Sequence, residues 1–304
     1  MRRSSSLRPS PSFILPRKTG EETRGWHGPV LILLSALAFS TAGLFTRLIE
    51  VDVWTMLFWR GFYGGLFIAG YVIWRDGTLA ALALRRIGIP GLVAAACSTA
   101  ATICFINALR ETTVADVLVI NATAPFMTAA MAWLWAGVRE HRSTLIASSV
   151  ALLGVLVMVM ANLGSGHLLG DLLALLMTIL ISAMMVVIRQ QRHVCMLPAA
   201  ALSAFLCALV VWPWADPGAA EGWDFLYLVL FGTTQFGLGL LLLTLGTRLV
   251  SATRAALIGA LETPLAPALV WLVLGEVPPL MTCIGGAIVL AAVVGDLLAT
   301  REPS

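Results

Sequence analysis

The sequence has few charged residues. Only 12% of its 304 residues are Asp, Glu, Lys or Arg, whereas 59% are hydrophobic. An average soluble domain has about 25% charged residues, so this chain has too few to cover a water-facing surface. We therefore predict an all-α membrane protein, because helices satisfy their own backbone hydrogen bonds in lipid. The net charge of +3 is small, and it predicts no nucleic-acid partner.

Catalytic and metal-binding patterns are missing as well. The five cysteines show no CxxC spacing, and none of the four histidines falls within a long apolar run. The sequence contains no HExxH, GxSxG or phosphate-binding GxxxxGKT pattern. We therefore predict no cofactor, no metal site and no enzyme activity, and keep an intramembrane enzyme only as an alternative.

Ten apolar runs have the length of about 20 residues that a helix needs to cross the hydrocarbon core of a membrane. We place these runs at residues 29–49, 54–74, 88–108, 113–137, 143–162, 169–188, 196–214, 224–246, 251–274 and 279–299. Residues 1–28 are rich in Ser, Pro and Arg and are predicted to form a disordered cytoplasmic tail. The connections between the runs are short.

Arginine and lysine are distributed unevenly over these connections. If the amino terminus is cytoplasmic, sixteen of them lie on the cytoplasmic side, and only Arg47 and Arg110 lie on the other. Cytoplasmic connections of membrane proteins normally carry such an excess. We predict a multi-pass protein of the cell inner (cytoplasmic) membrane with both termini cytoplasmic.

The two halves of the chain repeat one pattern. At an offset of 138 residues, predicted helices four and five match helices nine and ten, and Trp133 falls on Trp271. Because five helices is an odd number, the second copy enters the membrane from the opposite side. The sequence thus predicts ten transmembrane helices in two inverted five-helix repeats, residues 29–162 and 169–299. Superposing the halves is expected to bring the two tryptophans together.

Four segments in this order resemble the drug/metabolite transporter (DMT) superfamily, in particular its ten-helix EamA-type permeases. They read LSALAFSTAGLFTR, WTMLFWRGFYGGLF, PFMTAAMAWLWAG and LETPLAPALVWLVLGE, and the resemblance covers about residues 29–299. It implies a secondary transporter that moves a small metabolite or drug-like solute by alternating access. A passive facilitator or channel is the alternative. One departure is that the usual Glu-Pro pair of helix nine is here Glu262, Thr263 and Pro264.

Glu262 is the sharpest candidate for a transport site. It lies about halfway along predicted helix nine, just before Pro264. Ionisable residues inside a membrane are costly and mark functional sites by default. Glu262 would bind a cationic group of the solute or a coupling proton, or alternatively satisfy backbone groups that the proline frees. When the first half is aligned on the second at the offset of 138 residues, Asn121 falls one helical turn before Glu262 and on the same helix face. We therefore predict that the two side chains share a central polar cavity.

Arg60 and Trp59 lie early in predicted helix two. A guanidinium binds anions in a planar fork and stacks on aromatic rings, so this pair could hold a substrate carboxylate or phosphate. The alternative is that Arg60 extends outward to the membrane surface. Ser40 and Gln235 complete the predicted substrate-binding set by supplying neutral hydrogen bonds, although small polar residues of this kind also bond helices to one another.

Gly61 and Gly65 form a GxxxG pattern in helix two, which favours packing within the chain and leaves a homodimer open. Asp171 and Asp296 lie near predicted helix ends, and we interpret both as boundary groups in contact with water. The predicted partners are therefore a small-molecule substrate and the lipid bilayer, with proton coupling left open.

Overall fold

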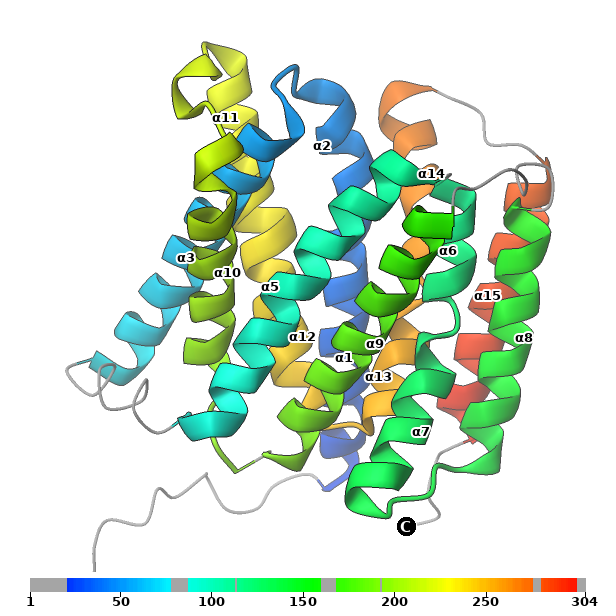
Figure 1. Cartoon of the computed structure of the whole chain (residues 1–304). Coiled ribbons are helices and arrows are strands. Elements are labelled where there is room, and N and C mark those ends of the chain that lie inside the picture. The colour runs from blue at the N-terminus through cyan, green and yellow to red at the C-terminus, as the bar shows by residue number, and fades with distance from the viewer. Residues whose placement is uncertain are drawn as a thin grey trace, which may run out of the picture.

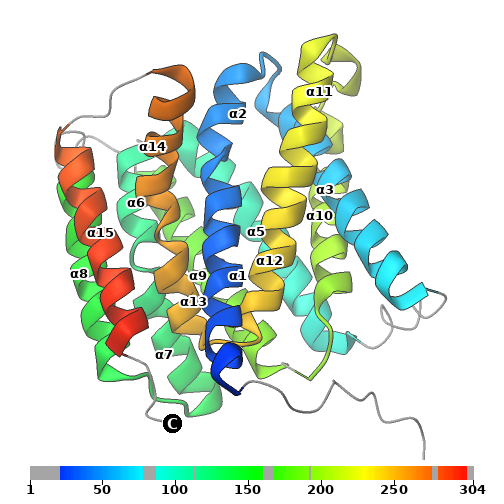
Figure 2. The ribbon, with the colours of Figure 1, turned by 180° about the vertical axis from the view of Figure 1, so that it is seen from behind.

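The structure is a computed structural model of the whole chain. It describes residues 21–77, 87–112, 114–159, 168–191, 193–275 and 280–299. Within these ranges all regular structure is helical. The helices form one bundle, in which the start of α1 and the end of α15 lie at the same end (the lower end in Figures 1 and 2).

The first half of the chain forms seven described helices: α1 (Glu21–Ser40), α2 (Ala42–Leu48), α3 (Val53–Asp76), α5 (Gly88–Glu111), α6 (Val114–Asn121), α7 (Ala124–Ala136) and α8 (Arg142–Val159). The second half forms α9 (Leu168–Gln190), α10 (Leu197–Val211), two short 3-10 turns η2 (Trp212–Trp214) and η3 (Pro217–Ala219), α11 (Trp223–Leu230), the π-helix η4 (Phe231–Leu238), α12 (Gly239–Thr247), α13 (Ala252–Gly259), α14 (Glu262–Leu274) and α15 (Leu280–Ala299).

Nine helical stretches among the described residues are long and apolar enough to cross a membrane. They correspond to nine of the ten predicted runs. The remaining run, predicted at residues 143–162, is α8, whose apolar stretch Arg142–Val157 is shorter. Residues 160–167, which include the end of that predicted run, lie outside the described part of the chain. The chain is therefore a multi-pass membrane protein.

Helix α1 begins before the point that the sequence predicts. The predicted disordered tail extends to residue 28, but α1 starts at Glu21 and contains Pro29 in its interior. The rest of the predicted tail, residues 1–20, lies outside the described residues.

Predicted helices four and nine are each broken near the middle. The first break, at residues 122–123, separates α6 from α7, and the second, at residues 260–261, separates α13 from α14. The two breaks have the same offset of 138 residues that relates the sequences. A proline lies in the first turn after each break, Pro125 and Pro264, where its missing N–H group breaks no helical hydrogen bond. The break expected beside Pro264 thus has a counterpart in the first half.

The two broken helices also end in the same way. Gly137 ends α7 with φ 63° and Gly275 ends α14 with φ 74°, a left-handed conformation that glycine adopts without strain. The N–H group of each glycine donates to the carbonyl of the tryptophan four residues earlier, Trp133 or Trp271, at 2.9 Å. The two tryptophans therefore occupy equivalent positions, in the last turn of α7 and of α14.

The principal helix pairs join the two halves of the chain. α5 packs against α9, α8 against α15, α3 against α10, α7 against α13, and α1 against α12. Each of these pairs contains one helix from the first half and one from the second. The two repeats are therefore interleaved in a single bundle.

The GxxxG pattern of α3 packs against α10 of the same chain. A Cβ atom added at Gly61 would lie 2.8 Å from the carbonyl oxygen of Ala204, and one at Gly65 would lie 2.9 Å from the ring of Phe205. Only glycine permits so close an approach of the two helices. The prediction that this pattern packs within the chain is confirmed.

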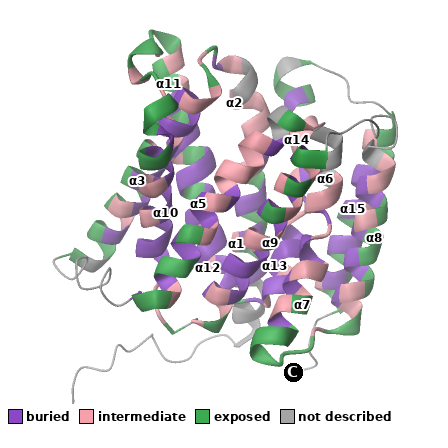
Figure 3. Cartoon of the chain, in the orientation of Figure 1, coloured by how far each residue is buried: buried purple, intermediate pink, exposed green. Residues whose placement is uncertain are grey.

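Buried apolar side chains are concentrated in the lower half of the bundle (Figure 3). Residues 255–258 of α13 and 197–201 of α10 are all buried. In the upper half, residues 41–45 and 264–269 are half-buried throughout, although they lie on α2 and α14 inside the bundle. The interior is therefore tightly packed at the lower end and more loosely packed at the upper end.

Candidate functional site

Arg60 of α3 points into the bundle. Its Nε atom donates a hydrogen bond to Oε1 of Gln235 at 3.0 Å. The guanidinium carbon lies 4.3 Å from the ring centre of Phe236 and 5.4 Å from that of Phe231, within the range of attractive cation–π contacts. An arginine that extended to the membrane surface would make none of these contacts. Of the two alternatives for Arg60, the structure therefore supports the inward one.

Gln235 holds Arg60 in this position. Its side chain is 2% exposed, and its Nε2 atom donates to the carbonyl oxygen of Phe39, near the end of α1, at 3.4 Å. The amide accepts on one side and donates on the other, so its orientation is set by both neighbours. Gln235 uses its side chain to join Arg60 to α1, and its predicted hydrogen bond to a substrate stays a prediction.

The partners of Arg60 share one segment, the π-helix η4. A π-helix bonds residues five apart along the chain, so Phe231 and Phe236 come to the same side, with Gln235 beside them. In an α-helix Phe236 would point to a different face from Phe231. Sequence reasoning missed both phenylalanines, because the helix type of this apolar run cannot be recognised from its composition.

Two glycines allow η4 to lie directly against α3. A Cβ atom at Gly64 would lie 2.7 Å from Cδ1 of Phe236 and 3.0 Å from the carbonyl oxygen of Gly232. A Cβ atom at Gly232 would lie 2.6 Å from Cβ of Tyr63. The two backbones therefore touch beside Arg60, and this contact brings the phenylalanine rings within reach of its guanidinium.

Trp59 contacts a different group of aromatic residues. Its ring stacks on Tyr63 at a centroid distance of 5.3 Å and meets the ring of Phe225 edge-on at 5.6 Å. Adjacent residues of a helix point about 100° apart, so Trp59 and Arg60 face different neighbours. Its Nε1 atom is buried without a hydrogen-bond partner among the described residues. The rings that stack on Arg60 are those of Phe231 and Phe236 instead.

Glu262 is the first residue of α14, directly after the break. A carboxylate is favourable there because the first N–H groups of a helix are unpaired. No hydrogen bond or ion pair to another residue of the described ranges holds this carboxylate, and the residue is half-buried. It interacts electrostatically with Arg60 across the interior. The two opposite charges therefore influence each other without forming a direct ion pair.

Asn121 and Ser40 each lie at the end of a helix, where the next helix begins after a short break. Asn121 is the last residue of α6, directly before the break that matches the one at Glu262. It is half-buried, and its sharing of a cavity with Glu262 stays a prediction. Ser40 is buried at the end of α1 and donates to the carbonyl oxygen of Leu37 at 2.7 Å. Its hydroxyl is thus used by its own helix.

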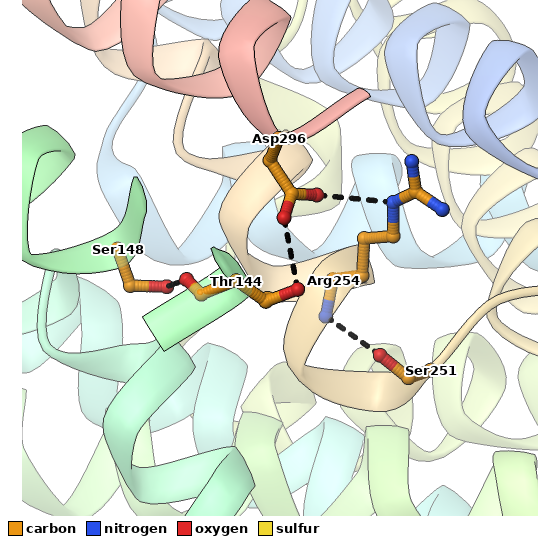
Figure 4. A network of polar contacts seen from close by, with 5 residues as sticks. All are labelled: Thr144, Ser148, Ser251, Arg254 and Asp296. Carbon is orange, nitrogen blue, oxygen red and sulfur yellow. Dashed lines mark hydrogen bonds and ion pairs between the residues drawn. The ribbon is translucent and has the colours of Figure 1, made fainter. Parts of the chain in front are cut away.

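A second charged group lies in the tightly packed lower half (Figure 4). Nε of Arg254 on α13 lies 3.1 Å from Oδ2 of Asp296 on α15, whose side chain has no exposed surface. Thr144 of α8 donates to the other carboxylate oxygen at 2.8 Å. The prediction that Asp296 is a boundary group in contact with water is therefore wrong, because α8 and α13 cover it. The carboxylate joins three helices in the lower half of the bundle.

Two hollows in the described part of the chain lie away from Arg60 and Glu262. A cavity of about 10 Å³ between α5, α9, α10 and α12 is large enough for about one water molecule. A groove of about 430 Å³ between α8 and α15 is lined mainly by alanine, glycine and aliphatic residues. Neither hollow brings together the predicted site residues.

Comparison with known proteins identifies the family of this sequence. The profile of the EamA-like transporter family matches residues 26–160 and again residues 168–296. No curated protein matches the sequence. A solved structure described only as a crystal structure of a protein has a TM-score of 0.76, with 90% of this chain and 97% of the other covered and 18% identity. At that identity the likeness concerns the fold alone.

Proposed function

The chain belongs to the EamA-like transporter family, and from this premise we propose that it is a secondary transporter for a small metabolite or drug-like solute. It would work by alternating access in the cytoplasmic membrane, without enzymatic activity. The observation that carries the proposal is the double family match, which assigns one transporter repeat to each half of the chain.

We further propose that the bundle has ten transmembrane helices in two inverted repeats. The matching breaks and the matching glycine ends of α7 and α14 support this arrangement. The helix pairs support it as well. Exchanging the repeats returns the pairs α3–α10 and α8–α15 to themselves, and converts α5–α9 into α12–α1. A two-fold axis between the repeats would produce this pattern of neighbours.

Alternating access is supported by the unequal packing of the two ends. The largest buried cluster lies mainly in the lower half and only smaller clusters lie above it, and the upper segments of α2 and α14 are only half-buried. We propose that the lower end is cytoplasmic, because it holds the start of α1 and the end of α15, which the Arg and Lys distribution assigns to that side. The structure would then represent a state that is closed to the cytoplasm and looser toward the outside.

We place the solute between the π-helix η4 and the break before α14. Glu262 would bind a cationic group of the solute or a coupling proton, and Asn121 would face it from the matching break. One observation supports this placement: the carboxylate of Glu262 is not held by any residue of the described ranges.

Purified protein in proteoliposomes tests the function. The vesicles are loaded with a mixture of isotope-labelled metabolites, and the exchange of each solute against an external mixture is followed by mass spectrometry. A transporter exchanges an intact solute and is stimulated by that solute on the opposite side. A channel conducts without such stimulation, and an enzyme produces a new chemical species. Vesicles that contain inserted protein and exchange nothing would reject the proposal.

Matched variants link the exchange to the proposed site. Glu262→Ala should abolish exchange, because it removes the carboxylate at the break. Glu221→Ala changes an exposed carboxylate between η3 and α11 and should leave exchange intact. Equal exchange by both variants would show that transport does not use Glu262.

A further inference from the structure

We infer that Arg60 is the receptor for a carboxylate, so that the transported solute is an organic anion or carries a carboxylate group. This inference rests on the proposed function and names the solute class for the same site.

The charge of Arg60 is not neutralised by an ion pair. Its guanidinium contacts an amide and two aromatic rings, and Cys207 and Glu262 act on it only from a distance. No carboxylate of the described residues forms an ion pair with it. Removing a cation from water costs several kcal/mol unless an opposite charge compensates it. A binding site for an anion explains why such a cost is retained inside the bundle.

The donors that recognise a carboxylate are unused. Arg60 employs only Nε in its hydrogen bond to Gln235, which leaves Nη1 and Nη2 without a partner among the described residues. Trp59 Nε1 is fully buried and lacks a hydrogen-bond partner. Neither Nη atom of Arg60 is fully buried in this way, so both border accessible space. Two adjacent N–H groups of a guanidinium fit the two oxygens of a carboxylate.

The surroundings of Arg60 hold its guanidinium in one orientation. Gln235 is fixed in turn by Phe39, and the ring of Phe236 lies against the guanidinium at 4.3 Å. π-Helical turns are rare and occur frequently at functional sites, and here the π-helix supplies all three contacts. A fixed guanidinium binds an anion more tightly than a mobile one, because less side-chain entropy is lost on binding.

The balance of charge favours a carboxylate over a phosphate. Arg60 and Glu262 together have no net charge when both are ionised. A monoanionic carboxylate leaves a single excess negative charge, which either a proton on Glu262 or a cationic group of the solute can neutralise. A phosphate with two negative charges would need a second cation, and Arg60 is the cation that the described residues place here.

Ligand-dependent thermal unfolding of the full-length protein tests this inference. Benzoate is the probe, since it presents a planar carboxylate on an apolar ring, and phosphate and choline are the comparators. We expect benzoate to raise the unfolding midpoint of the wild type in a saturable manner. In Arg60→Gln the concentration for half of that effect should rise about tenfold or more, because two charge-assisted hydrogen bonds are lost.

Arg75→Gln is the matched control, because it removes the same charge from the other end of α3. It should respond to benzoate like the wild type, and Arg60→Lys should fall between wild type and Arg60→Gln, since lysine keeps the charge without the fork. If Arg60→Gln does not fold, Phe236→Leu replaces it: losing the ring that holds the guanidinium should weaken benzoate binding severalfold.

The inference is overturned if benzoate shifts the wild type and Arg60→Gln equally, if it has no effect on the wild type, or if phosphate acts more strongly. These outcomes are distinct from a failure of the proposed function. Exchange of a neutral or cationic solute with equal rates in wild type and Arg60→Gln would leave a transporter without this anion site. Benzoate binding by a protein that exchanges no solute would leave the anion site without transport.

Discussion

The ion pair between Arg254 and Asp296 is predicted to stabilise the closed end of the bundle. Removing one member of a buried ion pair costs roughly 3–5 kcal/mol. Arg254 keeps 18% of its side chain exposed, and its Nε–H is not aligned for a hydrogen bond to the carboxylate. We therefore expect Asp296→Asn, which still accepts from Thr144, to lower the free energy of unfolding by about 2–3 kcal/mol.

The reverse substitution should be more harmful. Arg254→Gln removes the guanidinium that lies 3.1 Å from the carboxylate of Asp296, which has no exposed surface, and we expect a loss of about 3–5 kcal/mol. The double variant should lose less free energy of unfolding than the two single variants lose together. The difference, which is the coupling energy, should be about 1–3 kcal/mol. The measurement is the loss of helical circular dichroism during titration of protein in mixed micelles with dodecyl sulfate.

Asp171→Asn provides the matched control. Asp171 of α9 also accepts a hydrogen bond from a threonine of a neighbouring helix, Thr112, at 2.9 Å, but it is only half-buried. Its substitution should cost about 1 kcal/mol or less. If Asp296→Asn costs no more than this control, or if the losses in the cycle are additive, the pair does not stabilise the closed end and the reasoning is wrong.

Three further predictions concern the site, the packing and the topology. Glu262→Gln should abolish the pH dependence of transport while membrane expression stays normal; pH-dependent transport by this variant would reject a coupling role. Gly64→Val should destabilise the protein by about 1–3 kcal/mol because of the contact with η4, whereas Gly70→Val, at a position with no neighbour within 4 Å, should change stability little. A membrane-impermeant thiol reagent added outside should label a cysteine at Asp216 and not one at His193, beside Arg192; the opposite labelling would invert the topology.

Local patterns in the sequence account for the membrane class, the family and the broken helix nine. The length of an apolar run and the position of a proline act on the backbone around them, whatever the rest of the chain does. The second break, between α6 and α7, was not predicted, although it has the same offset of 138 residues that relates the two halves. The glycines after Trp133 and Trp271 are the clearest case of this repeat.

The candidate site was predictable only as separate residues. Arg60 and Glu262 were recognised because charge is rare in a membrane span. Their partners were not, since Gln235 and Phe236 lie far along the chain and reach Arg60 through a π-helix that composition does not reveal. Trp59 was expected to act beside Arg60, but the two side chains have different neighbours, because adjacent residues of a helix face different directions.

Asp296 shows most clearly what the sequence determined and what the tertiary structure decided. Its position near the end of an apolar run established that a carboxylate lies at one end of the last helix, and nothing more. Its burial depends on α8 and α13, which bring Thr144 and Arg254 against it from distant parts of the chain. Sequence determines which residues enter the membrane, because hydrophobicity acts locally. Only packing decides which charges meet there, because an ion pair depends on distances between helices.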